Sequence, residues 1–169
     1  EIDAEEVAIE AEVIRLMALY QPVGADLRFL CAVLKVNSDL ERVADCVVNI
    51  AERAMNNGLS ALARNSEELR QMCPLVRRVL RNAIHAYNTE DAEAARQVLR
   101  EDNAIDVLYN EISRKVVAGA ATDPQNVGAQ LDLLTIAKTL ERVADHATNI
   151  AEDVIYLATG AIVRHRSEE

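Results

Sequence analysis

Apolar and polar residues follow one another along this chain with the spacing of α-helices. Apolar side chains recur every three to four residues over long segments, which places them on one side of a helix. No segment shows the strict alternation that is typical of a half-buried strand. We therefore predict an all-α fold. Five helices are expected, over about 1–20, 27–57, 66–87, 90–120 and 127–163.

Helix-breaking and helix-capping residues favour these boundaries. Pro22 stops the first helix, and Asp26 is expected to cap the second, because a side-chain oxygen at that position accepts a hydrogen bond from a free backbone N–H. Gly58 suits the left-handed turn that often ends a helix. Pro124 and Asn126 repeat the stop-and-cap pattern before the last helix.

An internal repeat organises the chain. Residues 41–45 read Glu-Arg-Val-Ala-Asp and recur as residues 141–145. Residues 49–52 read Asn-Ile-Ala-Glu and recur as residues 149–152. Nine identical residues at one constant offset of 100 indicate a duplicated helical unit.

The repeat predicts two three-helix bundles in tandem. The fourth and fifth expected helices correspond to the first and second, but the third has no counterpart before residue 1. We therefore expect an incomplete first repeat over 1–59, without its opening helix in this chain, and a complete second repeat over 60–169.

Each repeat carries polar side chains four residues apart, in the pattern Glu-x-x-x-Asp-x-x-x-Asn. They lie along one side of a helix, away from the bulky apolar residues, so we expect them to face solvent. A row of this kind is usually only the solvent-exposed face of an amphipathic helix. Here glutamate and aspartate four residues apart repel each other, yet both repeats contain the pair. The row comprises Glu41, Asp45 and Asn49, and again Glu141, Asp145 and Asn149.

Antiparallel hairpins would bring further carboxylates to these rows. Asp106 lies 17 residues before Asp123, and Glu141 lies 18 residues after it, so both reach the same level. A similar count around the first turn brings Asp3 close to Glu41. Carboxylates gathered in this way repel unless a cation neutralises them. The candidate metal ligands are Asp102, Asp106, Glu141 and Asp145 at one site and Asp3, Glu41 and Asp45 at the other, with Asn49 and Asn149 as additional polar contacts.

The ligand type limits the cofactor to metals that accept oxygen ligands. Carboxylates suit hard divalent or trivalent ions, so iron, manganese, magnesium, calcium and zinc remain candidates. His146 follows Asp145, but the helical rotation of 100° between neighbours turns it aside, and we expect an exposed histidine.

Composition and charge narrow the function. The net charge of −10 argues against unaided binding to nucleic acid, which needs a basic surface, and suits cations or basic protein patches. The longest nearly apolar run, 154–163, is too short to span a membrane, so no direct insertion is expected. Three cysteines without metal-binding spacing indicate small core side chains and a reducing compartment: Cys31, Cys46 and Cys73.

The sequence contains no arrangement typical of catalysis. No glutamate has a histidine three residues on, as ferritin-like di-metal enzymes require, and no Gly-rich phosphate loop or nucleophile–histidine pairing stands out. We predict that the protein is not an enzyme. A metal-dependent hydrolase or a metal-storage bundle stays open as the alternative.

Residues 21–28, Gln-Pro-Val-Gly-Ala-Asp-Leu-Arg, followed by the duplicated Glu-Arg-x-x-Asp, make the chain similar to the PhoU family of phosphate-signalling proteins. The resemblance implies two three-helix bundles with metal-binding acidic motifs on neighbouring helices. It also implies a cytoplasmic negative regulator that links a phosphate ABC transporter to a sensor histidine kinase. A homodimer is compatible with it.

Overall fold

The computed structural model describes residues 2–55 and 59–163. Within these residues the chain is helical and contains no strand, which confirms the all-α prediction. The elements follow one another as α1 (Ile2–Tyr20), α2 (Gly24–Ala54), α3 (Leu59–Asn65), α4 (Glu67–Thr89), α5 (Ala92–Thr122), the short 3₁₀ helix η1 (Pro124–Asn126) and α6 (Val127–Thr159).

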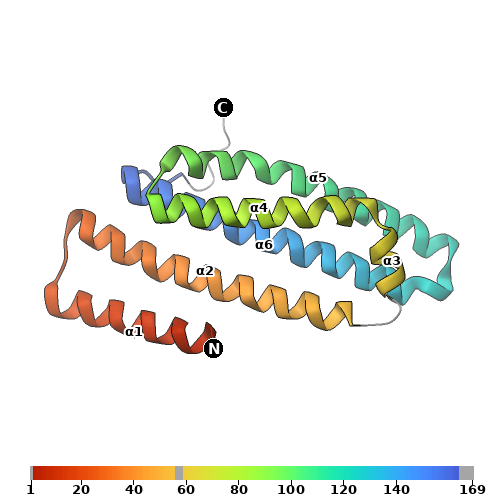
Figure 1. Cartoon of the computed structure of the whole chain (residues 1–169), viewed down its shortest axis with the longest axis horizontal. Coiled ribbons are helices and arrows are strands. Elements are labelled where there is room, and N and C mark those ends of the chain that lie inside the picture. Colours follow the sequence, from red (N-terminus) through yellow and green to blue (C-terminus); the bar gives the residue numbers. More distant parts are fainter. Residues whose placement is uncertain (1, 56–58, 164–169) are drawn as a thin grey trace.

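Successive long helices run antiparallel and form two connected units (Figure 1). Helices α4, α5 and α6 pack against one another as a three-helix bundle, and α1 and α2 form a hairpin. Helix α2 lies along α6, so it joins the hairpin to the bundle, and α1 lies on the other side of α2. The proposed division at residues 59 and 60 stays a prediction.

Several helix boundaries differ from the sequence expectation. Pro22 does follow the end of α1, where the backbone N–H of Gln21 donates to the carbonyl oxygen of Met17 at 3.1 Å. The prediction that Asp26 caps the second helix is wrong, because α2 already begins at Gly24 and Asp26 lies in its first turn. A carboxylate there still interacts favourably with the positive end of the helix dipole. The expected stop at Gly58 lies outside the described residues.

Local hydrogen bonds explain the other helix starts. Ser66 caps α4 by accepting a hydrogen bond from the Leu69 N–H at 3.2 Å, and Asp91 caps α5 through the N–H groups of Glu93 and Ala94. Asn126 occupies the cap position of α6, but its side chain makes no capping bond. It donates instead to Asp123 Oδ2 at 2.6 Å. The short α3 was not expected from the sequence.

Helices α2 and α6 cross as equivalent halves of the repeat. Val43 and Val143 are 8% and 4% exposed and belong to the same hydrophobic core, as the repeat predicts. On either side of this crossing, Lys35 pairs with Asp153 at 2.9 Å, and Arg53 pairs with Asp132 at 3.2 Å. Lys35 precedes Val43 and its partner Asp153 follows Val143, whereas Arg53 follows Val43 and its partner Asp132 precedes Val143. An approximate two-fold axis between Val43 and Val143 therefore relates the two pairs.

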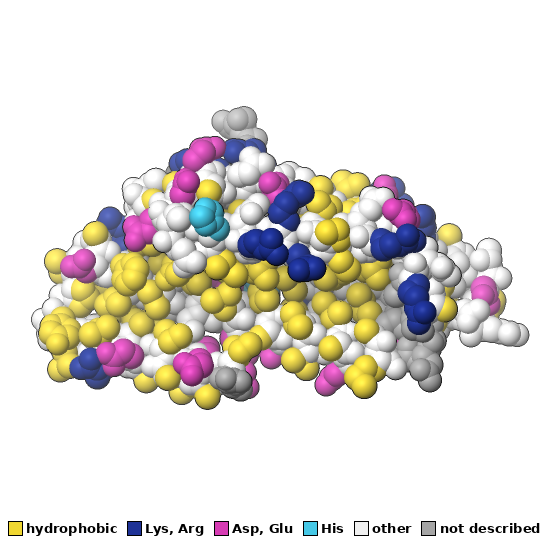
Figure 2. Space-filling view, in the orientation of Figure 1, with side chains coloured by type: hydrophobic (Ala, Val, Ile, Leu, Met, Phe, Trp, Pro, Cys, Tyr) yellow, Lys and Arg dark blue, Asp and Glu magenta, His cyan; other side chains and the backbone are white. Residues whose placement is uncertain are grey.

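The two repeats differ in how much apolar surface they bury. Leu140 and Ala147 of α6 are 9% and 0% exposed, whereas Leu40 and Val47 at the same positions of α2 are 38% and 55% exposed. Helices α4 and α5 cover α6, while α2 packs mainly against α1 and α6 and has a small contact with α3 (Figure 1). Figure 2 shows hydrophobic side chains spread over the face where α2 lies below α4. In α1, Val13 is the single buried side chain.

Replacing Ile150 with alanine should lower the free energy of unfolding by about 2–5 kcal/mol, because the fully buried side chain leaves a cavity in the core. The matched control, Ile14→Ala on α1, removes a side chain that is 53% exposed and should cost less than about 1 kcal/mol. Urea denaturation followed by circular dichroism measures both. Equal losses would contradict the placement of the core.

Candidate functional site

Four carboxylates of the second repeat form an acidic cluster between α5 and α6. Asp102 and Asp106 lie on α5, and Glu141 and Asp145 lie on α6. The two helices approach closely near Gly119, where an added Cβ would lie 2.9 Å from Nε2 of Gln130. Counting equally along the antiparallel helices from this contact brings Asp106 between the levels of Glu141 and Asp145. The hairpin therefore assembles the predicted set, called the second acidic cluster below.

The charges in the second acidic cluster act on one another. The pKa of Asp102 is raised to about 6, first by burial and then by the charges of Asp106, Asp145 and Glu141. Asp106 and Asp145 are more exposed, but burial and then the charge of Glu141 raise the pKa of each. The repulsion that the sequence predicted is thus present in the fold.

One cation within the chain partly neutralises this cluster. The Lys138 ammonium donates to Glu141 Oε1 at 2.6 Å and to Oε2 at 2.5 Å, and it lies 5.2 Å from the ring centroid of Tyr109. Its charge lowers the pKa of Asp106 and Asp145, against the larger effect of burial. Lys138 was not among the predicted site residues, although a lysine three residues before a glutamate is a recognisable helical ion pair.

The donor chemistry of the second acidic cluster fits a metal ion, but the ligands are not arranged around one. Within the described ranges, no three acidic, histidine or cysteine side chains are placed so that they could share an ion. Because Lys138 contacts both oxygens of Glu141, this ammonium must move aside before Glu141 binds a metal.

The acidic cluster of the first repeat has a different counter-ion. Arg42 Nε lies 3.4 Å from Glu41, and Arg42 Nη1 lies 3.7 Å from Asp45. The Asn37 side-chain amide donates to the Glu6 carbonyl oxygen at 2.9 Å. This contact fixes the register of α1 on α2, so that Glu41 is level with the start of α1. The participation of Asp3, which lies in that first turn, stays a prediction.

His146 and Asn149 turn towards α2. Asp39 Oδ1 lies 2.8 Å from His146 Nδ1 and accepts a hydrogen bond from Asn149 Nδ2 at 3.2 Å. The expectation of an exposed histidine was wrong, because the His146 side chain is only 17% exposed and takes part in the contact between α2 and α6. The helical rotation that directs it away from Asp145 directs it towards a neighbouring helix. The equivalent Asn49 accepts a hydrogen bond from Arg53 Nε at 3.2 Å.

These observations define an all-helical protein built from two repeats, each with an acidic pair on its long central helix. A model of the PhoU domain matches residues 1–54 and 69–154, which include both repeated segments. The chain therefore belongs to the PhoU domain family.

Relatives and solved structures agree with this assignment. A protein of Deinococcus radiodurans named phosphate-specific transport system accessory protein PhoU homolog is 36% identical over 161 residues, which cover 95% of this chain and 76% of that protein. A protein of the same name from Caulobacter vibrioides is 39% identical over 163 residues, covering 94% and 70%. The crystal structure of PhoU from Pseudomonas aeruginosa has a TM-score of 0.85 at 32% identity, covering 95% of this chain and 77% of that one. The corresponding values for PhoU from Streptococcus pneumoniae are 0.85, 33%, 96% and 76%.

Asp102→Asn should stabilise the metal-free protein above pH 6. Because folding raises the pKa of Asp102, the folded protein keeps this proton between about pH 4 and 6, where the unfolded chain has released it. The contribution of Asp102 to the free energy of unfolding therefore falls as pH rises through that window. Relative to wild type, Asp102→Asn should gain roughly 1–2 kcal/mol at pH 7 and little at pH 4.

The measurement is urea denaturation in EDTA across this pH range, with the exposed Asp26→Asn as the matched control. A gain that does not change with pH would show that the charge of Asp102 is not responsible.

Proposed function

We propose that this chain is a metal-binding regulatory adaptor of a phosphate-specific transport system. The observation that carries the proposal is its membership of the PhoU domain family, in which relatives with 36% and 39% identity are named accessory proteins of such a system. Its role is to couple a phosphate ABC transporter to a sensor histidine kinase as a negative regulator. No observation on the described residues favours the hydrolase or storage alternative.

The metal sites of this proposal are the two acidic clusters. Asp102, Asp106, Glu141 and Asp145 would hold one ion. The pKa of Asp102 is raised first by burial and then by the neighbouring carboxylates, and a bound cation would offset the repulsion between these charges. In the first repeat, Glu41 and Asp45 would bind an ion together with Asp3, after Arg42 moves away. The metal supplies positive charge and fixes neighbouring helices relative to each other.

The adaptor role requires protein surfaces rather than a membrane anchor. No helix among the described residues is long and apolar enough to cross a bilayer. The net charge of −10 is repelled by anionic lipid, so attachment to the cytoplasmic side of the transporter would occur through protein contacts. The nucleotide-binding subunit of the transporter and the kinase are the proposed partners, and basic patches on them would meet the acidic surface.

Asp145→Asn should lower the amount of metal bound per chain and leave the fold intact. The change removes one anionic ligand from the second acidic cluster but preserves the shape of the side chain, and the first cluster should keep its metal. Elemental analysis of protein purified without chelator or nickel resin measures the content. Asp26→Asn, the same change at an exposed position outside the clusters, should bind as wild type does. Equal metal content in all three proteins would contradict the assignment of Asp145.

Cells that lack this protein should express phosphate-starvation genes even when phosphate is plentiful, because nothing then couples transporter and kinase. A reporter for a kinase-controlled promoter, measured in high and low phosphate, checks this result. Full repression in high phosphate without the protein would refute the adaptor role, whatever metal the chain binds.

A further inference from the structure

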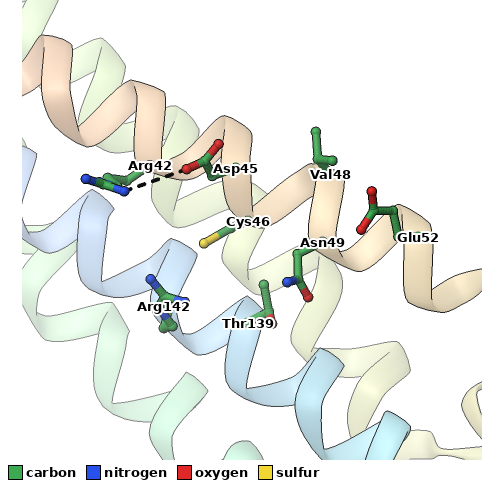
Figure 3. Close-up of a pocket in the computed structure, with 8 residues that line it drawn as sticks. All are labelled: Arg42, Asp45, Cys46, Val48, Asn49, Glu52, Thr139 and Arg142. Atoms are coloured by element: carbon green, nitrogen blue, oxygen red, sulfur yellow. Dashed lines mark ion pairs between the residues drawn. The ribbon is translucent and has the colours of Figure 1, made fainter. Parts of the chain in front are cut away.

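A polar pocket of about 300 Å³ lies between α2 and α6, on the side of the α2–α6 contact away from His146. This volume is at the lower end of the range for small-molecule sites. Figure 3 shows side chains from both helices around it. The lining residues are Arg42, Asp45, Cys46, Val48, Asn49, Glu52, Thr139 and Arg142.

The approximate two-fold axis explains why a pocket exists here. On the other side of the axis, the Asp39 carboxylate fills the equivalent space and contacts His146 and Asn149. The residues equivalent to these three are Thr139, Cys46 and Asn49, all of which line the pocket. Threonine replaces the carboxylate, and a thiol replaces the imidazole. The pocket thus lies where the other side of the axis has the carboxylate of Asp39 and the imidazole ring of His146.

Hydrogen-bond donors around the pocket lack the acceptor that Asp39 provides on the other side. The Thr139 hydroxyl donates to the Thr135 carbonyl oxygen at 2.7 Å and supplies no negative charge. Asn49 Nδ2 points towards Thr139 in Figure 3 and has no acceptor among the described residues. Arg142 takes part in no ion pair with a described residue, and its charge lowers the pKa of the Cys46 thiol, against the larger effect of burial.

We propose that this pocket binds a small oxyanion that carries a proton, with inorganic hydrogen phosphate as the matching ion. Arg142 and the Asn49 amide donate to its oxygens, as Asn149 donates to Asp39. Arg42 adds a second guanidinium, since its contacts with Glu41 and Asp45 are long, at 3.4 and 3.7 Å. Arginine is well suited to oxyanions because its planar fork presents several donors.

The acidic residues in the lining determine which oxyanion fits. Asp45 and Glu52 would repel a fully deprotonated ion, but they accept a hydrogen bond from a P–OH group. Phosphate carries such a proton at neutral pH and sulfate does not, so the pocket should prefer phosphate. Burial raises the pKa of the Cys46 thiol, which therefore stays neutral and adds no opposing charge. The inference goes beyond the regulatory role and does not depend on it.

The test is calorimetric titration of the full chain with inorganic phosphate in EDTA, which excludes binding through metal at the acidic clusters. Arg142→Gln should weaken phosphate binding at least about tenfold, because a charge-assisted hydrogen bond is lost. Thr139→Asp restores the carboxylate that the other repeat has, and it should weaken binding by a similar factor. Arg77→Gln, at an exposed arginine of α4 outside the pocket, should bind as wild type does.

Thermal unfolding by circular dichroism selects the variants that are folded, and either pocket variant suffices. Sulfate should bind at least about tenfold more weakly than phosphate. Absence of phosphate binding by the wild type, unchanged affinity in a folded pocket variant, or equal affinity for sulfate would each overturn the proposal. None of these results depends on whether the chain controls a transporter in cells.

Discussion

The contact between α2 and α6 is the constraint on which the rest of the structure depends. Val43 and Val143 are buried in the same core at equivalent positions of the two helices, and ion pairs from Lys35 and Arg53 lie on either side. Both helices come from the same repeated segment. The offset of 100 residues therefore relates a pair of facing positions on one side of the contact to the equivalent pair on the other side. The contact joins the hairpin to the bundle, and it leaves the acidic side of α6 facing α5. Where the sequences of the two repeats differ, the surfaces on the two sides of this contact therefore differ as well.

The acidic clusters show a conflict between stability and function. Burial, and then the charges of the three other carboxylates between α5 and α6, raise the pKa of Asp102 to about 6, so folding disfavours the ionised form of this group. Lys138 and Arg42 reduce the conflict as counter-ions within the chain. Sites that violate local rules of stability are where function is expected, and the proposed cation would relieve this repulsion.

The fold was predictable because its signals are local and repeated, whereas its cross-helix contacts were not. Periodicity and the duplicated segment identified the long helices and the hairpin that assembles the second acidic cluster. Asp26 and Asn126 were predicted to cap helices through their side chains, and neither does so. Asp26 lies in the first turn of α2, and the Asn126 side chain bonds to Asp123 instead. The contact of His146 with Asp39 depends on how α2 packs on α6, and no spacing within one helix determines that. Helix α3 is too short for periodicity to separate it from a loop.

The single buried side chain of α1, Val13, has a consequence for how the molecule opens. Local unfolding free energy follows buried contacts, so α1 belongs to the least protected cooperative unit, and α4, α5 and α6 to the most protected one. Backbone amides of α1 therefore exchange with solvent through partial openings that leave the three-helix bundle closed. A protein that bound α1 would therefore stabilise this helix without changing the α4–α6 bundle.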